Sequence, residues 1–493
     1  MSLEIAIASA EMYPYAKVGG LGDVVAALAK ELDRMGHRVT VFLPRYAAFT
    51  TGKWKDLPFE ARGTVEAWIG DRMERADLTT AVIPGSNVRL ALIGHDGYYA
   101  RENPYVDPRT GRDWPDNDRR FVFFSKAVLD AMETLDYSPD VLHLNDYQTG
   151  LMAAILRETL KGRPRYDRMG TLYSIHNMGY QGVFGREILP LLGLDQSLAA
   201  PMGPLEFYDK INFMKAGIVY ADLVNTVSER YAEEIQSTAE HGFGLEGVLR
   251  ARRADLLGIL NGIDTEVWNP STDKLIPFNY DGSDLEGKAA NKIRLLETME
   301  LPVEPQVPLI GVISRLVSQK GFDLLEMIAG DLMGERLKLV VLGTGEPRFQ
   351  QLMERLRERY PQKFSVSLEF NDALAHLIEA GSDFFLMPSK YEPCGLNQMY
   401  SLRYGTIPIV RATGGLADTV HDYNPETGKG NGFVFEEYTG EALLKAIRRG
   451  LDAYERRNSW RKLVREAMEI DHSWRSAAQR YVEVYERIKA RRA

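Results

Sequence analysis

Residues 4–44 decide the fold, and they read EIAIASAEMYPYAKVGGLGDVVAALAKELDRMGHRVTVFLP. The apolar run 4–10 predicts a short strand. Residues 23–36 show helical periodicity, with Asp23 placed to cap the helix and Gly36 to end it. Residues 37–44 predict the next strand. Buried strands joined through a helix in this order indicate a parallel sheet in an α/β fold.

The loop between this strand and helix contains a turn that occurs twice in the chain. KVGGLGDVV at residues 17–25 and ATGGLADTV at residues 412–420 share the pattern x-Gly-Gly-Leu-x-Asp-x-Val. A Gly-Gly turn can bring backbone N–H groups close to a ligand and open a helix behind them. Each copy could equally be a tight turn with no ligand. Neither fits G-x-G-x-x-G, which disfavours a nicotinamide cofactor.

Two series of strand-like runs divide the chain. In the first, residues 141–146, 171–177 and 222–228 each end in polar side chains. Ligands in open α/β sheets bind beyond the carboxyl ends of the strands. The first candidate site residues are therefore Asn145, Asp146, His176, Asn177, Thr226 and Ser228.

The second series has six strand-like runs, from LLGILNGID at residues 256–264 to IPIVRATGG at 407–415. We therefore expect two Rossmann-like, doubly wound parallel-sheet domains, at residues 1–255 and 256–470. Residues 471–493 predict a C-terminal helix that crosses back to the N-terminal domain. Two such domains facing each other across a deep cleft are typical of nucleotide-sugar transferases.

Composition excludes several other classes of protein. The chain of 493 residues has a net charge of -9 and no basic block, which disfavours nucleic acid and anionic membranes as partners. A single cysteine, Cys394, excludes an internal disulfide and a Cys-based zinc site. The N-terminus lacks the features of a signal or transit peptide, and no apolar run approaches membrane-spanning length. We expect a cytoplasmic protein.

Two segments of the second half carry residues suited to phosphate chemistry. Arg315 and Lys320 follow a strand, and such a pair can neutralise a diphosphate leaving group without a metal. An ordinary solvated pair of charges is the alternative. Glu392 precedes Pro393 and a helix start, where a carboxylate can bind sugar hydroxyls or simply favour the helix dipole. Cys394 has no histidine nearby in sequence, so a buried thiol is favoured over a nucleophile.

Residues 116–118, Asp-Asn-Asp, match the D-x-D pattern of metal-dependent transferases. They directly precede the helical run RRFVFFSKAVLDAM. We therefore predict a helix N-terminal cap here and no metal site.

Seven segments occur in the order found in starch and bacterial glycogen synthases, which the chain resembles over almost its whole length. This resemblance implies a GT-B fold and a retaining glucosyltransferase. ADP-glucose would be the donor and the non-reducing end of glycogen or another α-1,4-glucan primer the acceptor, with no cofactor and no metal. The segments are KVGGLGDV, NDYQTGL, IHNMGYQG, LNGID, SRLVSQKG, EPCGLNQMYSLRYGTIPIVRATGGLADTV and NGFVF.

The resemblance also implies residue roles. Residues expected to take part in catalysis are Asp146, His176, Arg315, Lys320 and Glu392. Residues expected to bind the donor are Lys17, Gly19, Gly20, Asn261, Phe370, Cys394, Gly395, Leu396 and Asn397. Residues expected to bind the acceptor are Tyr105 and Gln181.

Simpler interpretations remain open for some of these residues. Lys17 could be an exposed loop lysine, Asp146 and His176 could cap strand ends, and Phe370, expected as an aromatic lid on adenine, could belong to the core. Asn397 and Phe370 stand where the family commonly has threonine and tyrosine, which leaves UDP-glucose open as the donor. A glucan-binding protein without catalysis is another alternative. A phosphorylase is disfavoured, since no pyridoxal-lysine motif is present.

Overall fold

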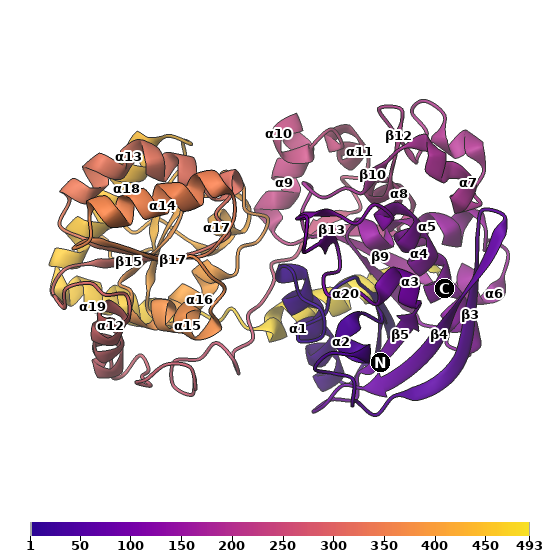
Figure 1. Cartoon of the computed structure of the whole chain (residues 1–493), viewed down its shortest axis with the longest axis horizontal. Coiled ribbons are helices and arrows are strands. Elements are labelled where there is room, and N and C mark those ends of the chain that lie inside the picture. Colours follow the sequence, from indigo (N-terminus) through magenta and orange to yellow (C-terminus); the bar gives the residue numbers. More distant parts are fainter. Residues whose placement is uncertain (1, 493) are drawn as a thin grey trace. The chain divides into compact units, whose positions relative to one another are not determined.

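The computed structural model describes residues 2–492, which form two compact α/β units. The first unit extends to Asn261 and resumes at Trp474, and the second is Gly262–Ser473 (Figure 1). The boundaries expected from the sequence, 255/256 and 470/471, lie a few residues before those of the structure. Within residues 2–492, the helices include none that is both long and apolar enough to cross a membrane.

The first unit is built on a sheet of nine strands, in the order β14-β13-β9-β8-β1-β2-β5-β4-β3. Neighbours from β14 to β5 are parallel, whereas β4 pairs antiparallel with both β5 and β3. This antiparallel hairpin was not predicted. The strands are β1 (Glu4–Ala8), β2 (Arg38–Pro44), β3 (Glu60–Ile69), β4 (Arg72–Val82), β5 (Arg89–Gly94), β8 (Val141–Asn145), β9 (Gly170–Ile175), β13 (Leu223–Thr226) and β14 (Leu256–Gly258).

Helices cover both faces of this sheet, as expected for a doubly wound fold. One hydrophobic core lies beneath α1 and α20, and the other beneath α4, α5 and α8. A small antiparallel sheet, β10-β12-β11, follows β9 in the chain. These elements are α1 (Gly20–Arg34), α4 (Asn117–Thr134), α5 (Tyr147–Glu158), α8 (Phe213–Tyr220), α9 (Glu229–Ser237), α10 (Ala239–Gly242), α11 (Glu246–Ala251), α20 (Trp474–Arg492), β10 (Val183–Phe184), β11 (Glu206–Phe207) and β12 (Lys210–Asn212).

The predicted strand–helix–strand opening is confirmed, with one correction. Helix α1 begins at Gly20 with Gly19 at the N-cap, so Asp23 does not cap the helix and lies in its first turn. An acid there still favours the helix dipole. Gly36 ends the helix as predicted, with a left-handed φ of 88°.

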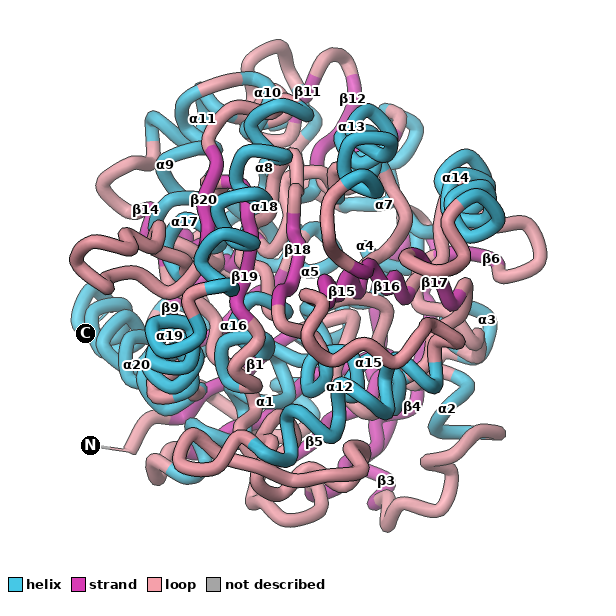
Figure 2. The backbone as a smooth tube through the Cα atoms, turned by 90° about the vertical axis from the view of Figure 1, so that its left-hand side faces the viewer, coloured by secondary structure: helices cyan, strands magenta, loops and turns pink. Residues whose placement is uncertain are grey.

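The second unit has a six-stranded sheet in the order β17-β16-β15-β18-β19-β20, which Figure 2 shows from one edge to the other. All of its neighbours are parallel. Helices α13, α14 and α18 lie over one face, and α12, α15 and α16 over the other (Figures 1 and 2). The strands are β15 (Leu309–Ile313), β16 (Lys338–Leu342), β17 (Phe364–Ser367), β18 (Phe384–Met387), β19 (Ile407–Arg411) and β20 (Phe433–Phe435), and the helices are α12 (Glu286–Thr298), α13 (Phe322–Gly334), α14 (Pro347–Arg359), α15 (Asp372–Gly381), α16 (Asn397–Arg403), α17 (Gly414–Thr419), α18 (Gly440–Glu455) and α19 (Arg457–Met468).

One strand was assigned to the wrong sheet. Residues 256–258 were expected to open the second sheet, but they form β14, which pairs with β13 at the edge of the first. The sixth strand of the second sheet is β20, within the segment NGFVF. A run of three strand residues carries no local signal for its partner, so pairing had to come from tertiary structure.

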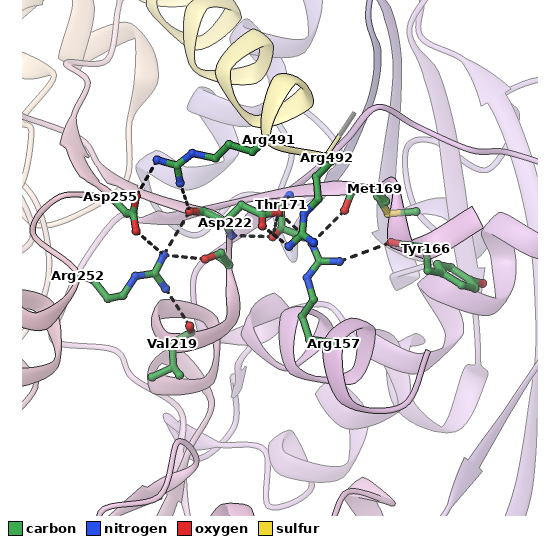
Figure 3. A network of polar contacts seen from close by, with 11 residues as sticks. Arg157, Tyr166, Met169, Thr171, Val219, Asp222, Arg252, Asp255, Arg491 and Arg492 are labelled. Carbon is green, nitrogen blue, oxygen red and sulfur yellow. Dashed lines mark hydrogen bonds and ion pairs between the residues drawn. The ribbon is translucent and has the colours of Figure 1, made fainter. Parts of the chain in front are cut away.

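Helix α20 packs within the first unit and ends in an ion-pair cluster, shown in Figure 3. Arg492 and Arg157 both contact the carboxylate of Asp222, the latter at 2.9 Å. Arg491 reaches Asp255 at 2.9 Å and the carbonyl of Asp222 at 3.1 Å. Burial alone would raise the pKa of the Asp222 carboxyl, but the hydrogen bond from Arg492 and the charge of Arg157 hold it below its ordinary value.

Candidate active site

Asp146 and His176 lie side by side at the carboxyl ends of the neighbouring strands β8 and β9. Asp146 has a left-handed φ of 53° and is buried. Its Oδ1 accepts the backbone N–H of His176 at 2.8 Å. Although Asp146 occupies the N-cap position of α5, its side chain makes no capping hydrogen bond to that helix. The geometry therefore joins two strand ends rather than capping a helix.

Burial controls the ionisation of both residues. It raises the pKa of the Asp146 carboxyl to about 7, against the opposing effect of the N–H groups of His176 and Asn177. Burial also lowers the pKa of the His176 imidazole to about 4, so the ring is neutral at pH 7. A carboxyl that titrates near neutrality at a strand end is typical of functional sites.

The tautomer of His176 follows from its partner. Asn145 donates its Nδ2 to the carbonyl of Ala8 at 3.1 Å, which leaves its Oδ1 as an acceptor. His176 Nε2 lies 2.9 Å from that Oδ1 and must therefore carry the proton. The lone pair of the neutral ring is then on Nδ1, where it can accept a hydrogen bond from a substrate hydroxyl.

Glu11 joins the first Gly-Gly turn to Tyr105, and sequence reasoning missed it. Its Oε2 accepts the N–H groups of Val18 at 2.6 Å and Gly19 at 2.9 Å. Its Oε1 accepts the hydroxyl of Tyr105 at 2.7 Å. The carboxylate is buried, and its charge contributes to raising the pKa of Asp146. An acid directly after a buried strand was the available signal, because a buried charge needs partners.

The first Gly-Gly turn leaves open space beside Gly19. A Cβ added at Gly19 would meet no atom of residues 2–492 within 4 Å, its two chain neighbours aside, and φ is -141°, which any residue can adopt. Gly20 is the first residue of α1. Lys17 pairs with Asp23 at 2.8 Å and lies over the ring of Tyr13. Neither packing nor backbone conformation therefore explains the glycine at position 19.

The second Gly-Gly turn packs differently. Cβ atoms at Gly414 and Gly415 would lie 2.0 Å from the carbonyl oxygens of Glu392 and Cys394, respectively. The N–H of Gly415 is taken by the carbonyls of Glu392 and Pro393, at 3.2 and 3.1 Å. The Gly415 N–H is therefore satisfied within the fold, which favours the alternative of a tight turn for this copy. These glycines instead let the chain approach the loop that carries Glu392.

Lys320 and Glu392 form a close ion pair in the second unit. Lys320 Nζ lies 2.6 Å from Glu392 Oε2, which also accepts the Ser389 hydroxyl at 3.0 Å. Glu392 is buried, so this is not a solvated surface pair. Gly321 has a left-handed φ of 79°, and a Cβ there would lie 2.0 Å from the carbonyl oxygen of Pro388. The Lys-Gly pair thus brings the lysine against the loop of Glu392.

The loop after Glu392 leads through residues 394–397 into α16. Cys394, the single cysteine of the chain, is buried, as predicted. Gly395 is left-handed, with a φ of 69°, and Leu396 occupies the N-cap position of α16. Asn397 donates its side-chain amide to the carbonyl of Ile313 at 2.9 Å, which ties this loop to the end of β15.

Four further predicted site residues differ in solvent exposure and in their hydrogen bonds. Phe370 is 87% exposed, so the interpretation as a core residue is wrong. Asn261 is 5% exposed, yet its Oδ1 has no hydrogen-bond partner among residues 2–492 and could accept one from a ligand. Arg315 is exposed, directly after β15. Gln181 uses both ends of its amide within the fold, accepting from Asn212 at 2.6 Å and donating to the carbonyl of Phe243 at 3.2 Å.

The Asp116-Asn117-Asp118 segment begins α4, but Asp116 does not cap it through its side chain. Its carboxylate instead binds Arg101 in a two-pronged ion pair, at 2.7 and 2.6 Å. The segment is thus the predicted helix N-terminus, with Asp116 at the N-cap position but without a capping hydrogen bond from its side chain. Within residues 2–492, no group of three or more His, Cys, Asp or Glu side chains is arranged to hold a metal ion.

Comparisons with known proteins cover the whole chain. Residues 4–251 match the model of the starch synthase catalytic domain, and residues 299–467 match glycosyl transferases group 1. The glycogen synthase of Koribacter versatilis is 44% identical over 492 residues, covering 100% of this chain and 99% of its own. That of Moorella thermoacetica is 46% identical over 495 residues, covering 100% and 98%.

Solved structures agree in fold. The catalytic domain of starch synthase IV from Arabidopsis thaliana, bound to ADP and acarbose, has a TM-score of 0.89 at 34% identity, covering 99% of this chain and 100% of its own. A sucrose-phosphate synthase from Thermosynechococcus elongatus has a TM-score of 0.60 at 18% identity, which is a likeness of fold alone. The predicted GT-B-type pair of α/β units is confirmed.

Proposed function

The chain belongs to the glycogen and starch synthase family, and we propose that it transfers glucose from ADP-glucose to the non-reducing end of an α-1,4-glucan, releasing ADP. The observation that carries this proposal is the ion pair between Lys320 and the buried Glu392, 2.6 Å apart, in a chain related to glycogen synthases over its full length. The bacterial origin of these relatives supports a cytoplasmic reaction.

The second unit supplies the donor site in this proposal. Arg315 and Lys320 hold the diphosphate and neutralise the charge that develops on departing ADP. Glu392 orients Lys320 through Oε2 and has Oε1 for a glucose hydroxyl. Phe370, exposed beside the start of α15, stacks on adenine. Backbone groups around the start of α16 contact the distal phosphate, and this segment comprises Cys394, Gly395, Leu396 and Asn397.

The first unit supplies the groups around the reacting bond and the acceptor. Lys17, Gly19 and Gly20 contact donor phosphate, and the open space beside Gly19 supports this assignment. His176 and Asp146 lie nearest the glucose, with the backbone carbonyl of His176 toward the anomeric carbon. The further assignments are a hydroxyl contact from Asn261 and acceptor contacts from Tyr105 and Gln181.

The proposed reaction retains the configuration of the anomeric carbon. The bond from this carbon to the diphosphate oxygen breaks first, giving an oxocarbenium-like ion paired with the leaving phosphate. The acceptor hydroxyl forms its bond on the same face and passes its proton to that phosphate oxygen. The protein acts through fixed charges and exclusion of water, with no carboxylate nucleophile.

Purified protein incubated with glycogen and either ADP-glucose or UDP-glucose, without added metal, tests the proposal. Release of ADP with gain of glucan is expected. Preference for UDP-glucose would keep the chemistry and change the donor, and transfer with neither would favour a glucan-binding protein. Arg315→Ala and Glu392→Ala should each lose on the order of 10²-fold in turnover, because charge-stabilising contacts are removed. Near-normal turnover in both variants would contradict the assigned donor site.

A further inference from the structure

A strained turn lies at the tip of the β11–β12 hairpin. Phe207 pairs with Lys210, so Tyr208 and Asp209 form a two-residue loop. Both are left-handed, with φ of 48° and 60°. Such loops strongly prefer Asn-Gly, and a bulky residue in this conformation costs about 1–2 kcal/mol. Strain of this kind persists where the surrounding structure holds it, and it concentrates at functional sites.

The turn is held by a built scaffold of polar contacts. Lys215, a buried residue on α8, donates its Nζ to the carbonyls of Gly203, at 2.8 Å, and Glu206. The carboxylate of Glu206 accepts the backbone N–H of Asp209 at 3.0 Å and that of Met202 at 3.2 Å. The hairpin tip is therefore a fixed surface.

The hairpin tip presents an exposed aromatic surface. Tyr208 is 77% exposed, and its ring packs edge-to-face on Phe207 with centroids 4.8 Å apart. Gly244 lies against both rings, since a Cβ there would be 3.0 Å from Phe207 and 3.4 Å from Tyr208. Phe243 beside it is also exposed and left-handed, with a φ of 49°. We call Phe207, Tyr208, Phe243 and Gly244 the Tyr208 platform, which comprises the end of β11, the turn that follows it and the two residues after α10.

Hydrogen bonds connect this platform to the loop that leaves His176. Gln181, on that loop, donates its Nε2 to the carbonyl of Phe243 at 3.2 Å. Its Oε1 accepts the Nδ2 of Asn212, the last residue of β12, at 2.6 Å. The platform and the predicted acceptor residue Gln181 thus belong to one rigid piece of the first unit.

We propose that the Tyr208 platform is a binding site for the α-glucan chain, separate from the residues that act on its reacting end. This inference rests on the proposed function. A glucan has many pyranose rings beyond the one that reacts, and the C–H faces of such rings pack well on aromatic side chains. A large apolar side chain held in solvent at a cost in backbone strain is accounted for by such a contact. Asp209 and Arg186, 3.2 Å apart beside the ring, can bind sugar hydroxyls.

The test uses Tyr208→Asn, because asparagine tolerates the left-handed conformation better than tyrosine. We expect KM for glycogen to rise about tenfold, as for loss of one aromatic contact. KM for ADP-glucose and turnover on maltotriose, which has few rings to spare, should stay near wild type. Tyr208→Phe should keep glycogen affinity. Trp68→Ala, which removes another exposed aromatic on β3, is the matched control and should change nothing.

Unchanged glycogen affinity in Tyr208→Asn would overturn the inference. So would an equal loss on glycogen and maltotriose with a lower unfolding temperature, because that result indicates a structural role. Co-sedimentation of each variant with glycogen, without donor, gives a second readout. If the wild-type protein transferred no glucose, the proposed function would fail, yet co-sedimentation would still report whether the platform binds glucan.

Discussion

Glu11 Oε2 lies 2.9 Å from the backbone nitrogen of Gly19, and the same oxygen accepts the N–H of Val18. The Glu11 carboxylate therefore holds the backbone of the first Gly-Gly turn by two hydrogen bonds, while the space beside Gly19 stays open. The second turn has no such opening, because Gly414 and Gly415 press on the loop of Glu392. Two turns with one sequence pattern thus differ in packing, and we propose that the first serves ligand approach whereas the second packs on a loop.

Replacing a glycine of each turn by alanine should affect donor binding at the first turn and stability at the second. Gly19→Ala should raise KM for ADP-glucose about tenfold by filling the open space, and cost under about 1 kcal/mol of stability as a changed N-cap. Gly415→Ala should destabilise the second unit by about 1–3 kcal/mol or more, since its Cβ would lie 2.0 Å from the Cys394 carbonyl oxygen. Thermal unfolding and donor KM are the measurements. A normal donor KM in Gly19→Ala would refute the contact.

Glu11 and Tyr105 should act as one unit. Tyr105→Phe removes only the hydroxyl that donates to Glu11 Oε1 at 2.7 Å, and Glu11→Gln removes the charge that accepts it. We expect both to lower kcat/KM and the double variant to add little, with a coupling of about 1–3 kcal/mol. The four proteins assayed at varied glycogen and varied ADP-glucose give this cycle. Additive losses would show that the two residues act separately.

Variants of the Lys320–Glu392 pair should affect stability and catalysis to different extents. Lys320→Ala leaves a buried carboxylate without its cation, which costs about 3–5 kcal/mol. Lys320→Ala with Glu392→Gln should recover much of that stability, because the stranded charge is gone, but almost no activity. Denaturant unfolding and ADP release measure the two effects. A double variant as unstable as Lys320→Ala would mean that the cost has another source.

Local patterns were enough for the parallel strands that the sequence predicts, because each is an apolar run beside a helix with clear periodicity. Local patterns did not predict that β14, a strand of three residues, pairs with β13 in the first sheet. They also did not predict the β3–β4 hairpin. Much of β3 is exposed, so it lacks the apolar run that marks the central strands. Partner choice in a sheet depends on tertiary packing, which no short window records.

The candidate site likewise contains residues that the sequence predicts and features that it does not. Lys320 and Glu392 were identified from phosphate chemistry and from the family resemblance, although they are 72 positions apart. Glu11 was missed because its importance depends on the loop at Val18 and Gly19 folding back over it. The unpartnered Oδ1 of Asn261 is likewise a property of three-dimensional surroundings. Residue type suggests chemistry, but hydrogen-bond satisfaction is known only from the fold.

Asp146 should make stability depend on pH. Its pKa rises on folding from 3.8 to about 7, so the stability it contributes is fully present below pH 3.8 and is lost as pH rises through 7. Asp146→Asn can still accept the His176 N–H and has no such titration. The variant should therefore gain on the wild type between pH 5 and 8, by about 3 kcal/mol, because about two pK units separate pH 5 from the folded pKa. Unfolding curves at both pH values test this, and parallel pH profiles would contradict it.

The end of α20 should stabilise the first unit through Arg492. Arg492→Ala removes one of two arginines from the carboxylate of Asp222, whose side chain is 10% exposed, and should cost about 1–3 kcal/mol. Arg480→Ala, on the same helix, breaks an exposed pair with Glu229 and should cost under about 1 kcal/mol. Because folding depresses the pKa of Asp222, its contribution is present above the ordinary value of 3.8 and is lost as pH falls through the folded pKa. The gap in unfolding temperature between Arg492→Ala and the wild type should therefore be wide at pH 7 and narrow below pH 4. Equal losses in the two variants would show that the Asp222 cluster adds nothing beyond a surface pair.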